Sequence, residues 1–406
     1  MARDNYIIVL TDRYYILKAK TDSDEQGSIF AFFIFNRPIL WRKWGTDVGT
    51  KIFRDEMTPR ERMEAVLTGK PFDRVPCSLQ VSNQAGKLAG ISHWQCYQSA
   101  ENTALTQFAA HRIFGVESVG TGPGLPGIAE AVGSTVFYPK EENTPYITDF
   151  ILKNYRDFEK LEIPDPWSKG RLPIHLKALE LMVEEIGNHV PVVTNLAGPF
   201  TTAANIRGTD HFLRDLYHNP EFVHRLLKFA VDSTLAYAKE AAKLGVRFSV
   251  ADPTASATLI GPKQFEEFAF PYLRDLIGAL KDLSGSAPSL HICGNTKKIW
   301  QAMADTGAGI LSLDDTIDLA VAKQEVGHRV ALLGNVKPTA SMYLGTPADV
   351  IRDGKECLGK AYDNPKGYIL ALGCGLPMCA PAENIHALFQ VAREFGRYPL
   401  IAENFN

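Results

Sequence analysis

The amino-acid sequence predicts an α/β protein, a (β/α)8 TIM barrel in a single domain with an N-terminal extension. Short apolar runs typical of strands alternate with amphipathic helical stretches over most of the chain. Polar residues gather directly after these runs, as they do at the active-site rim of such barrels. An open α/β sheet is the alternative, but the chain has no P-loop.

Eight apolar runs account for the eight expected strands. Amphipathic stretches such as EFVHRLLKFAVDSTLAYAKEAAKLG and PKQFEEFAFPYLRDLIGALKDL separate them and predict the surrounding helices. In chain order the runs read VPCSLQVS, GVESVGTG, PVVTNLAG, RFSVADPT, SLHICG, GILSLDD, VALLGNV and GYILALGCG.

The barrel domain is expected to span residues 57–406, and residues 1–56 form the extension. The extension holds aromatic-rich, strand-like stretches, NYIIVL with YYILKAK and then IFAFFIF. A helix start follows, with Thr58 as N-cap, Pro59 at the first helical position and Glu61 completing a capping box. We therefore expect the extension to be an accessory or poorly ordered element.

Composition excludes several classes of function. The 406 residues are 45% hydrophobic and 22% charged with a formal net charge of −3, so no basic field points to nucleic acid. No run has the roughly 20 apolar residues that cross a membrane. Six cysteines in a chain of this length do not form a disulfide framework. They indicate a reducing compartment, and we expect a cytoplasmic protein.

Two of the runs end on residues that bind soft metals. His291 and Cys293 lie two residues apart on one expected strand, so their side chains share a face. Cys374 lies at the end of the last run, and three such ligands on distant strands resemble a catalytic zinc site with one open position. The alternatives are a core histidine and small buried cysteines. Cys379 lies beyond a proline in the following loop, and we treat it as structural.

Five longer stretches resemble the uroporphyrinogen decarboxylase superfamily, and together they cover about residues 57–400. The His-x-Cys…Cys pattern is similar to that of its zinc-dependent corrinoid methyltransferase branch, which includes methylcobalamin:coenzyme M methyltransferases. The stretches are MTPRERMEAVLTGKPFDRVP, NLAGPFTTAANIRGTDHFLRDLYHNPEFV, ADPTASATLIGPKQFEEFAFPYL, HICGNTKKIWQAMADTGAGILSLDD and LLGNVKPTASMYLGTPADV.

The resemblance implies a reaction. A methyl group would move from a methylcobalamin-type corrinoid to a thiol such as coenzyme M, or to a folate. Zinc would be the resident cofactor, and coordination to it would activate the thiol. The chain shows no DxHxxG signature of a corrinoid module, so the corrinoid would be carried by a partner protein. A sulfonate on the acceptor would need a cation, for which Lys297, Lys298 and Lys337 are candidates.

The resemblance also suggests further site residues. Asp314 matches an acidic residue that takes the fourth zinc position in the coenzyme M enzymes, with Asp315 as the substitute. Capping of the next turn or helix is the structural alternative for Asp314. Asp252 is expected to orient substrate or to support His291, or else to form a turn before a proline. Asn195 and Asn335 end strands and are expected to hold polar groups of substrate or corrinoid. The glycines of ICGN, LLGN and LGCG are expected to let the backbone turn sharply beneath the metal.

Two other functions stay open at this point. A tetrapyrrole decarboxylase would need cations for many carboxylates, yet the segment VPCSLQVSNQAGKLAG has no arginine and one lysine, Lys87. A barrel that zinc only braces is the non-catalytic alternative. Entry of a thiol into the coordination sphere distinguishes a catalytic from a structural zinc.

Overall fold

A computed structural model of the chain describes residues 5–11, 14–20, 55–140, 143–400 and 405. In the extension, β1 (Asn5–Thr11) pairs antiparallel with β2 (Tyr14–Lys20). This confirms the first two strand-like stretches. The stretch IFAFFIF, at residues 29–35, lies outside the described residues.

The eight predicted barrel strands are all present, and only one of them, Val119–Gly124, extends beyond its apolar run, by two residues. They form one eight-stranded sheet in the order β3-β12-β11-β10-β9-β8-β7-β4, in which every pair is parallel. From β4 to β12, sheet strands that follow one another in the chain are neighbours in the sheet, and β12 pairs with β3, as in a (β/α)8 barrel; β3 and β4 stand at the two ends of this order. The sheet strands are β3 (Cys77–Ser78), β4 (Val119–Gly124), β7 (Val192–Ala197), β8 (Arg247–Ala251), β9 (Ser289–His291), β10 (Ile310–Ser312), β11 (Ala331–Val336) and β12 (Tyr368–Leu372). A separate hairpin pairs β5 (Thr135–Phe137) with β6 (Tyr146–Asp149).

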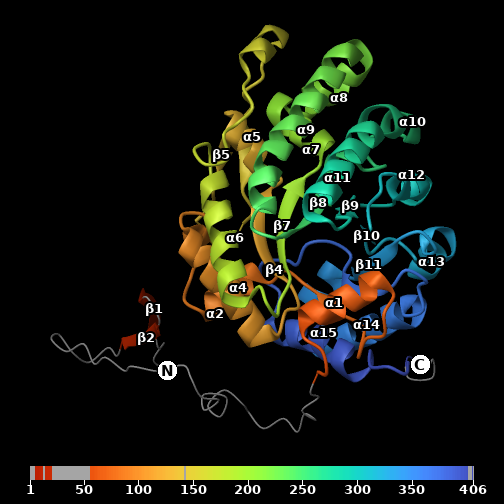
Figure 1. Cartoon of the computed structure of the whole chain (residues 1–406). Helices are drawn as coiled ribbons and strands as arrows, with labels where there is room; N and C mark the ends of the chain where they lie inside the picture. The colour runs from red at the N-terminus through yellow and green to blue at the C-terminus, as the bar shows by residue number, and fades with distance from the viewer. Residues whose placement is uncertain (1–4, 12–13, 21–54, 141–142, 401–404, 406) are drawn as a thin grey trace.

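Helices surround the curled sheet (Figure 1). They are α1 (Pro59–Thr68), α2 (Ser82–Leu88), α3 (His93–Cys96), α4 (Ala100–Phe114), α5 (Gly127–Val132), α6 (Leu172–Ile186), α7 (Pro199–Arg207), α8 (Thr209–His218), α9 (Pro220–Ala242), α10 (Pro262–Gln264), α11 (Phe270–Ser284), α12 (Trp300–Asp305), α13 (Leu319–Val326), α14 (Pro347–Ala361) and α15 (Ala382–Glu394). Shorter turns are the 3-10 helices η2 (Tyr155–Lys160), η3 (Pro253–Ala255) and η5 (Lys297–Ile299), and the π-helices η4 (Phe265–Ala269) and η6 (Pro338–Tyr343).

Helix α1 closes the end of the barrel at which the strands begin. Thr58 and Glu61 form the predicted capping box, and Pro59 is the first residue of the helix. Met63 and Val66 of α1 then pack on residues near the starts of three strands in a small buried cluster. The members of that cluster on the strands are Ile310, Ala331 and Ile369.

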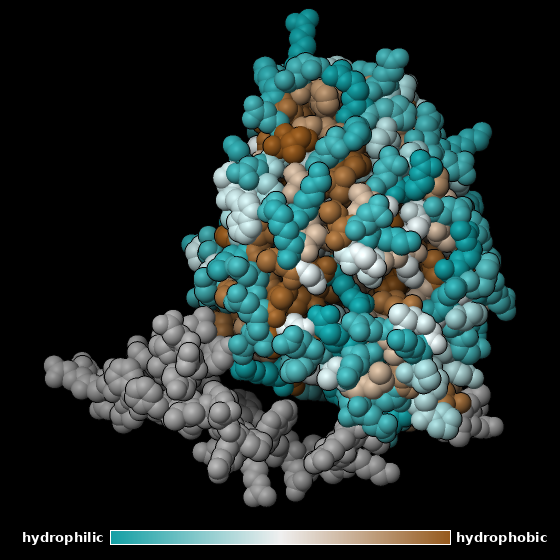
Figure 2. Space-filling model, viewed as in Figure 1, coloured by the Kyte–Doolittle hydropathy of each residue, from teal (hydrophilic) through white to brown (hydrophobic). Residues whose placement is uncertain are grey.

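A second, much larger core fills the space between the sheet and the helices. Hydrophilic residues dominate the face in Figure 2, and hydrophobic ones show mainly in the gaps between polar ridges. Among the residues that the structure describes, no helix has the length and apolar character that crossing a membrane requires.

Buried charges meet at the same end of the barrel as α1. The Arg62 guanidinium donates hydrogen bonds of 2.7 Å to both oxygens of Asp73 and lies 3.3 Å from Glu117. Arg74 pairs with Glu117 and donates bonds of 2.8 and 2.7 Å to Asp55. Because Asp55 belongs to this network, the contacts of the barrel include a residue that lies two positions before the boundary we expected at residue 57.

Candidate metal centre

The register of the strands decides which side chains face the barrel interior. On β9, His291 lies opposite Ala251 of β8 and Ser312 of β10. One layer below, Ser289 lies opposite Ser249, and their hydroxyls are 2.9 Å apart. Successive side chains alternate along a strand, so His291 points inward at the C-terminal end of the barrel.

Three of the predicted ligands converge in the structure. His291, Cys293 and Cys374 offer ligand atoms that all lie within 4.8 Å of one another. His291 Nε2 is 3.2 Å from Cys293 Sγ, which is 3.9 Å from Cys374 Sγ. The two cysteines are 81 residues apart in the chain, and β9 and β12 bring them together. One imidazole and two thiols form a donor set that fits zinc.

Ser312 orients the histidine, and sequence analysis missed it. His291 Nδ1 lies 3.2 Å from the Ser312 carbonyl oxygen and 3.1 Å from its hydroxyl. The carbonyl can only accept, so Nδ1 carries the proton and Nε2 is left as a lone-pair donor toward the cysteines. The signal was available, because Ser312 ends the strand next to His291.

The turn after Cys293 is built around a glycine. Gly294 has a φ of +77°, a conformation that other residues rarely adopt. The Ser256 hydroxyl donates a 2.8 Å hydrogen bond to the Cys293 carbonyl oxygen, and the Gly294 N–H donates one of 2.8 Å to Asp314 Oδ2. These contacts fix the direction in which the Cys293 side chain leaves the strand.

Asp314 lies beside the triad but is not among the groups that converge. Its second oxygen, Oδ1, accepts a 3.0 Å hydrogen bond from the Thr316 N–H. Both carboxylate oxygens thus accept backbone hydrogen bonds, which corresponds to the structural alternative we considered. Asp315 does not join the converging group either.

Asp252 is fully buried and faces helix α7. Its carboxylate accepts hydrogen bonds of 3.3 and 2.7 Å from the N–H groups of Phe200 and Thr201, in the first turn of that helix. Burial raises the pKa of this carboxyl to about 6. The Asp252 N–H donates 2.9 Å to the His291 carbonyl oxygen. The residue therefore supports the His291 strand through its backbone, and its side chain is turned toward the first turn of α7.

The two predicted asparagines have different positions. Asn195 lies opposite Ser249, one layer below His291, and faces the barrel interior because its neighbour Thr194 bonds to Tyr237 of α9. Asn335 is buried and donates hydrogen bonds of 2.9 and 2.7 Å to the carbonyl oxygens of Asp314 and Ile317. Asn335 therefore braces the loop after β10.

Proton affinity differs between the two cysteines. Hydrogen bonds with Cys293 and His291 lower the pKa of the Cys374 thiol to about 4. The hydrogen bond with Cys374, together with burial, raises the pKa of Cys293. Cys374 is also exposed, so the thiolate character of the site faces solvent.

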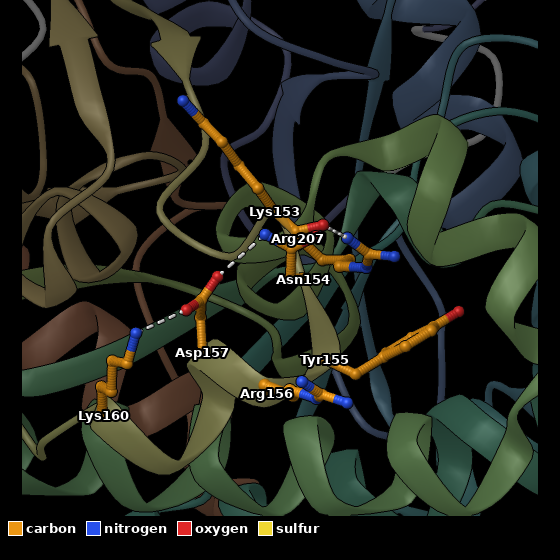
Figure 3. Close-up of a pocket in the computed structure, with 7 residues that line it drawn as sticks. All are labelled: Lys153, Asn154, Tyr155, Arg156, Asp157, Lys160 and Arg207. Atoms are coloured by element: carbon orange, nitrogen blue, oxygen red, sulfur yellow. Dashed lines mark hydrogen bonds and ion pairs between the residues drawn. The ribbon is translucent and has the colours of Figure 1, made fainter.

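A hollow away from the triad is lined by none of its three residues. It measures about 580 Å³ and is formed by the segment around η2 together with Arg207 (Figure 3). Arg207 donates 2.8 Å to the Lys153 carbonyl and pairs with Asp215, while Lys160 pairs with Asp157. Most of the cationic side chains that line this hollow are therefore paired with carboxylates. The side chains that could bind a metal lie at the triad instead.

Comparisons with known proteins agree with this geometry. The family model for uroporphyrinogen decarboxylase (URO-D) matches residues 58–395. A methylcobamide:CoM methyltransferase, MtbA of Methanosarcina acetivorans, is 31% identical over 84% of this chain and 99% of its own length. Uroporphyrinogen decarboxylase 2 of Oryza sativa is 27% identical over 66% of this chain and 67% of its own length.

Among solved structures, a methyltransferase from Methanosarcina mazei superimposes with a TM-score of 0.76 at 28% identity. The match covers 84% of this chain and 99% of that one. The fold similarity thus extends over the whole barrel and leaves out most of the extension. The chain belongs to the uroporphyrinogen decarboxylase (URO-D) family.

Proposed function

We propose that the protein is a zinc-dependent methyltransferase. It would move a methyl group from a methylated corrinoid, carried by a partner protein, to a thiol such as coenzyme M or another acceptor. The convergence of His291, Cys293 and Cys374 at the C-terminal end of the barrel is the observation that carries the proposal. The relative MtbA, named a methylcobamide:CoM methyltransferase, supports it.

In this proposal His291 Nε2 and the two cysteine sulfurs hold zinc. Zinc bound there would lower the pKa of an incoming thiol and hold the thiolate for attack on the methyl group. Ser312 keeps His291 in the tautomer that leaves Nε2 free to bind. The exposed position of Cys374 leaves one side of the centre open to the acceptor and to the methylated corrinoid.

The decarboxylase alternative has less support from the residues. After β3, the segment VPCSLQVSNQAGKLAG offers one lysine for a substrate that carries many carboxylates. The six cysteines, two of them in the triad, form no disulfide in the described part of the chain, which favours a reducing compartment such as the cytoplasm for the proposed enzyme.

Demethylation of free methylcobalamin by the zinc-loaded protein tests the proposal. We expect thiol-dependent loss of the methyl–cobalt absorbance, abolished in Cys374→Ala and unchanged in Cys379→Ala. Tetrahydrofolate serves as the non-thiol acceptor, and uroporphyrinogen as the decarboxylase substrate. Decarboxylation by zinc-free protein, with no thiol-dependent demethylation, would refute the proposed function.

Asp314 needs a separate experiment, because substitution of a zinc ligand and substitution of a carboxylate that only holds a turn have different effects. Asp314→Asn keeps one carbonyl oxygen for the Gly294 N–H and removes the negative charge. From the observed bonds we expect zinc affinity to stay within a few-fold and stability to fall by about 1–2 kcal/mol. A large loss of zinc affinity, measured by competition with a chelator, would restore Asp314 as the fourth ligand.

A further inference from the structure

The loop that carries Cys374 is bound by a helix from the start of the barrel domain. Residues 373–381 connect β12 to α15, and Cys374 is the second of them. Because β12 pairs with β3, the helix that follows β3, α2, lies beside this loop. Two consecutive residues of α2, Asn83 and Gln84, reach the loop with their side chains. Asn83 is 295 residues away in the chain from Met378, the loop residue to which it bonds.

Both side-chain amides donate hydrogen bonds to carbonyl oxygens of the loop. Asn83 Nδ2 donates one of 2.7 Å to the Met378 oxygen. Gln84 Nε2 donates one of 2.8 Å to the Pro377 oxygen and lies 3.3 Å from that of Met378. Asn83 and Gln84 are only 6% and 7% exposed, so water cannot readily take the place of either amide. Loss of these donors would leave the loop without its attachment to α2.

Helix α2 is itself attached to the rest of the barrel. Gln107 of α4 donates a 2.7 Å hydrogen bond to the Ser82 hydroxyl at the start of α2. The Oε1 atom of Gln107 accepts one of 3.3 Å from the Gly120 N–H of β4. A β-carbon on Gly86 would lie 3.5 Å from the Thr106 side chain, so α2 and α4 are in direct contact. The two amides therefore project from a helix that is bound to both α4 and β4.

Cys374 lies between two attachment points of its loop. On one side, the Gly373 N–H donates a 3.0 Å hydrogen bond to the Val336 carbonyl oxygen of β11. On the other side are the two carbonyl oxygens that α2 binds. Gly375 follows Cys374, and no atom of the described residues lies within 4 Å of where its β-carbon would be. Because a glycine backbone can adopt many conformations, the place of the Cys374 side chain depends on both attachment points.

We propose that Asn83 and Gln84 are positioning residues for the metal centre. They hold the loop so that Cys374 Sγ stays near Cys293 Sγ, 3.9 Å away, where both sulfurs can bind one zinc ion. This inference rests on the proposed function, since it concerns the zinc ligands of that site. The segment after β3, in which a decarboxylase would need cations, thus supplies two neutral amides that support a metal ligand.

Gln84→Met tests the amide with little change in side-chain length. The variant loses both N–H donors of Gln84, and its zinc Kd should rise by about 10-fold, the low end for residues that support a metal ligand. Asn83→Leu removes the other amide, and the double variant should reach up to about 100-fold. The Kd values are measured on the full chain by competition with a chelator. A wild-type Kd in the double variant overturns the positioning role.

A double-mutant cycle shows whether the amide acts through Cys374. In the background of Cys374→Ala the loop no longer carries a ligand, so Gln84→Met should change the remaining zinc affinity by less than about 2-fold. An amide that only stabilises the barrel would have the same effect in both backgrounds. Equal fold-changes with and without Cys374 would therefore overturn the proposal.

Asn364 provides a matched control at the opposite end of β12. It is 5% exposed, and its amide donates hydrogen bonds of 3.2 and 2.8 Å to the carbonyl oxygens of Val330 and Gly367, before the strand begins. Asn364→Leu should lower the melting temperature of the zinc-free protein about as much as Gln84→Met does. It should keep the wild-type zinc Kd, because the loop it holds carries no ligand. A weaker zinc Kd in this control would show that general loss of stability explains the result.

The failures of the two proposals are distinguishable. The expected zinc Kd values without any thiol-dependent demethylation would refute the proposed function and leave the positioning role standing. If the wild-type chain binds no zinc, the positioning role is measured on the zinc-free protein by oxidation with diamide, which joins neighbouring thiols in a disulfide. Cross-linking of Cys293 to Cys374, followed by mass spectrometry, should be several-fold slower in Gln84→Met than in wild type. Equal rates would overturn the positioning role.

Discussion

The two ends of the barrel treat charge in opposite ways. Where the strands begin, Arg62, Arg74 and Glu117 are buried and paired with one another or with nearby aspartates. Where the strands end, His291 and Cys374 are partly open to solvent and hold lone pairs toward a common point. At the first end the polar groups pair with one another, and at the second end they are available to bind a metal.

This difference separates the end of the barrel that contributes to folding stability from the end where we propose that metal binds. The paired charges join α1 to the segments that lead into β3 and β4, so they hold the closed end of the barrel together. Parallel strands all end on one side, which brings residues from distant parts of the chain to a single rim. Substitutions at the two ends should therefore separate folding from metal binding.

Removal of a triad cysteine should produce the largest effect. Cys293→Ala and Cys374→Ala should each lose most of the bound zinc, because a site of this kind depends on every ligand. Both variants should unfold at nearly the wild-type temperature of the zinc-free protein. Zinc content by mass spectrometry and thermal melts test this, and Cys379→Ala is the control that retains zinc.

Substitution of Glu117 should lower the stability of the protein and leave zinc binding unchanged. Glu117→Gln leaves Arg62 and Arg74 buried without their shared carboxylate, which should lower the free energy of unfolding by about 3–5 kcal/mol. Zinc affinity of the folded fraction should not change. Glu180→Gln, which removes an exposed pair with Lys177 on α6, should cost less than about 1 kcal/mol. A Glu117 variant as stable as this control would contradict the role of the network.

Two truncations should differ although they lie two residues apart. A chain that starts at Asp55 keeps both hydrogen bonds to Arg74, and a chain that starts at Met57 loses them. We expect the second to be less stable by about 1–3 kcal/mol in urea denaturation. The full-length Asp55→Asn variant controls for the new terminus. Equal stability of the two truncated chains would mean that the barrel domain starts at residue 57, as expected from the sequence.

Loss of the Ser312 hydroxyl should have the smallest effect. Ser312→Ala removes one of the two groups at His291 Nδ1 and leaves the carbonyl oxygen, so zinc affinity should fall by about 10-fold, the low end for such supporting residues. Ser289→Ala, one layer below on the His291 strand, is the matched control. An unchanged zinc Kd in Ser312→Ala would mean that the carbonyl alone sets the tautomer.

Much of the fold could be predicted because its signals are local. Each strand is a short apolar run, and the capping box at Thr58 depends on residues three positions apart. His291 and Cys293 share a face because of the two-residue period of a strand. The distant Cys374 could be joined to them because parallel barrel strands end at one rim.

The rest depended on contacts that no spacing encodes. Whether Asp314 faces a metal or the Gly294 N–H is decided by where the turn after β9 lies against β10. Ser312 reaches His291 through the lateral register of two strands. The Asp252 carboxylate faces α7 because the first turn of that helix lies against the end of β8.

By itself, then, the sequence determined the barrel class, the helix that opens it and the three soft donor residues that converge, since each follows from the period of a strand or helix or from the common rim of parallel strands. Tertiary structure alone decided the direction of the Asp252 and Asp314 carboxylates and the partner of Asp55. A side chain turns toward whichever donor the packing of other segments brings near, and that arrangement is a property of the folded chain.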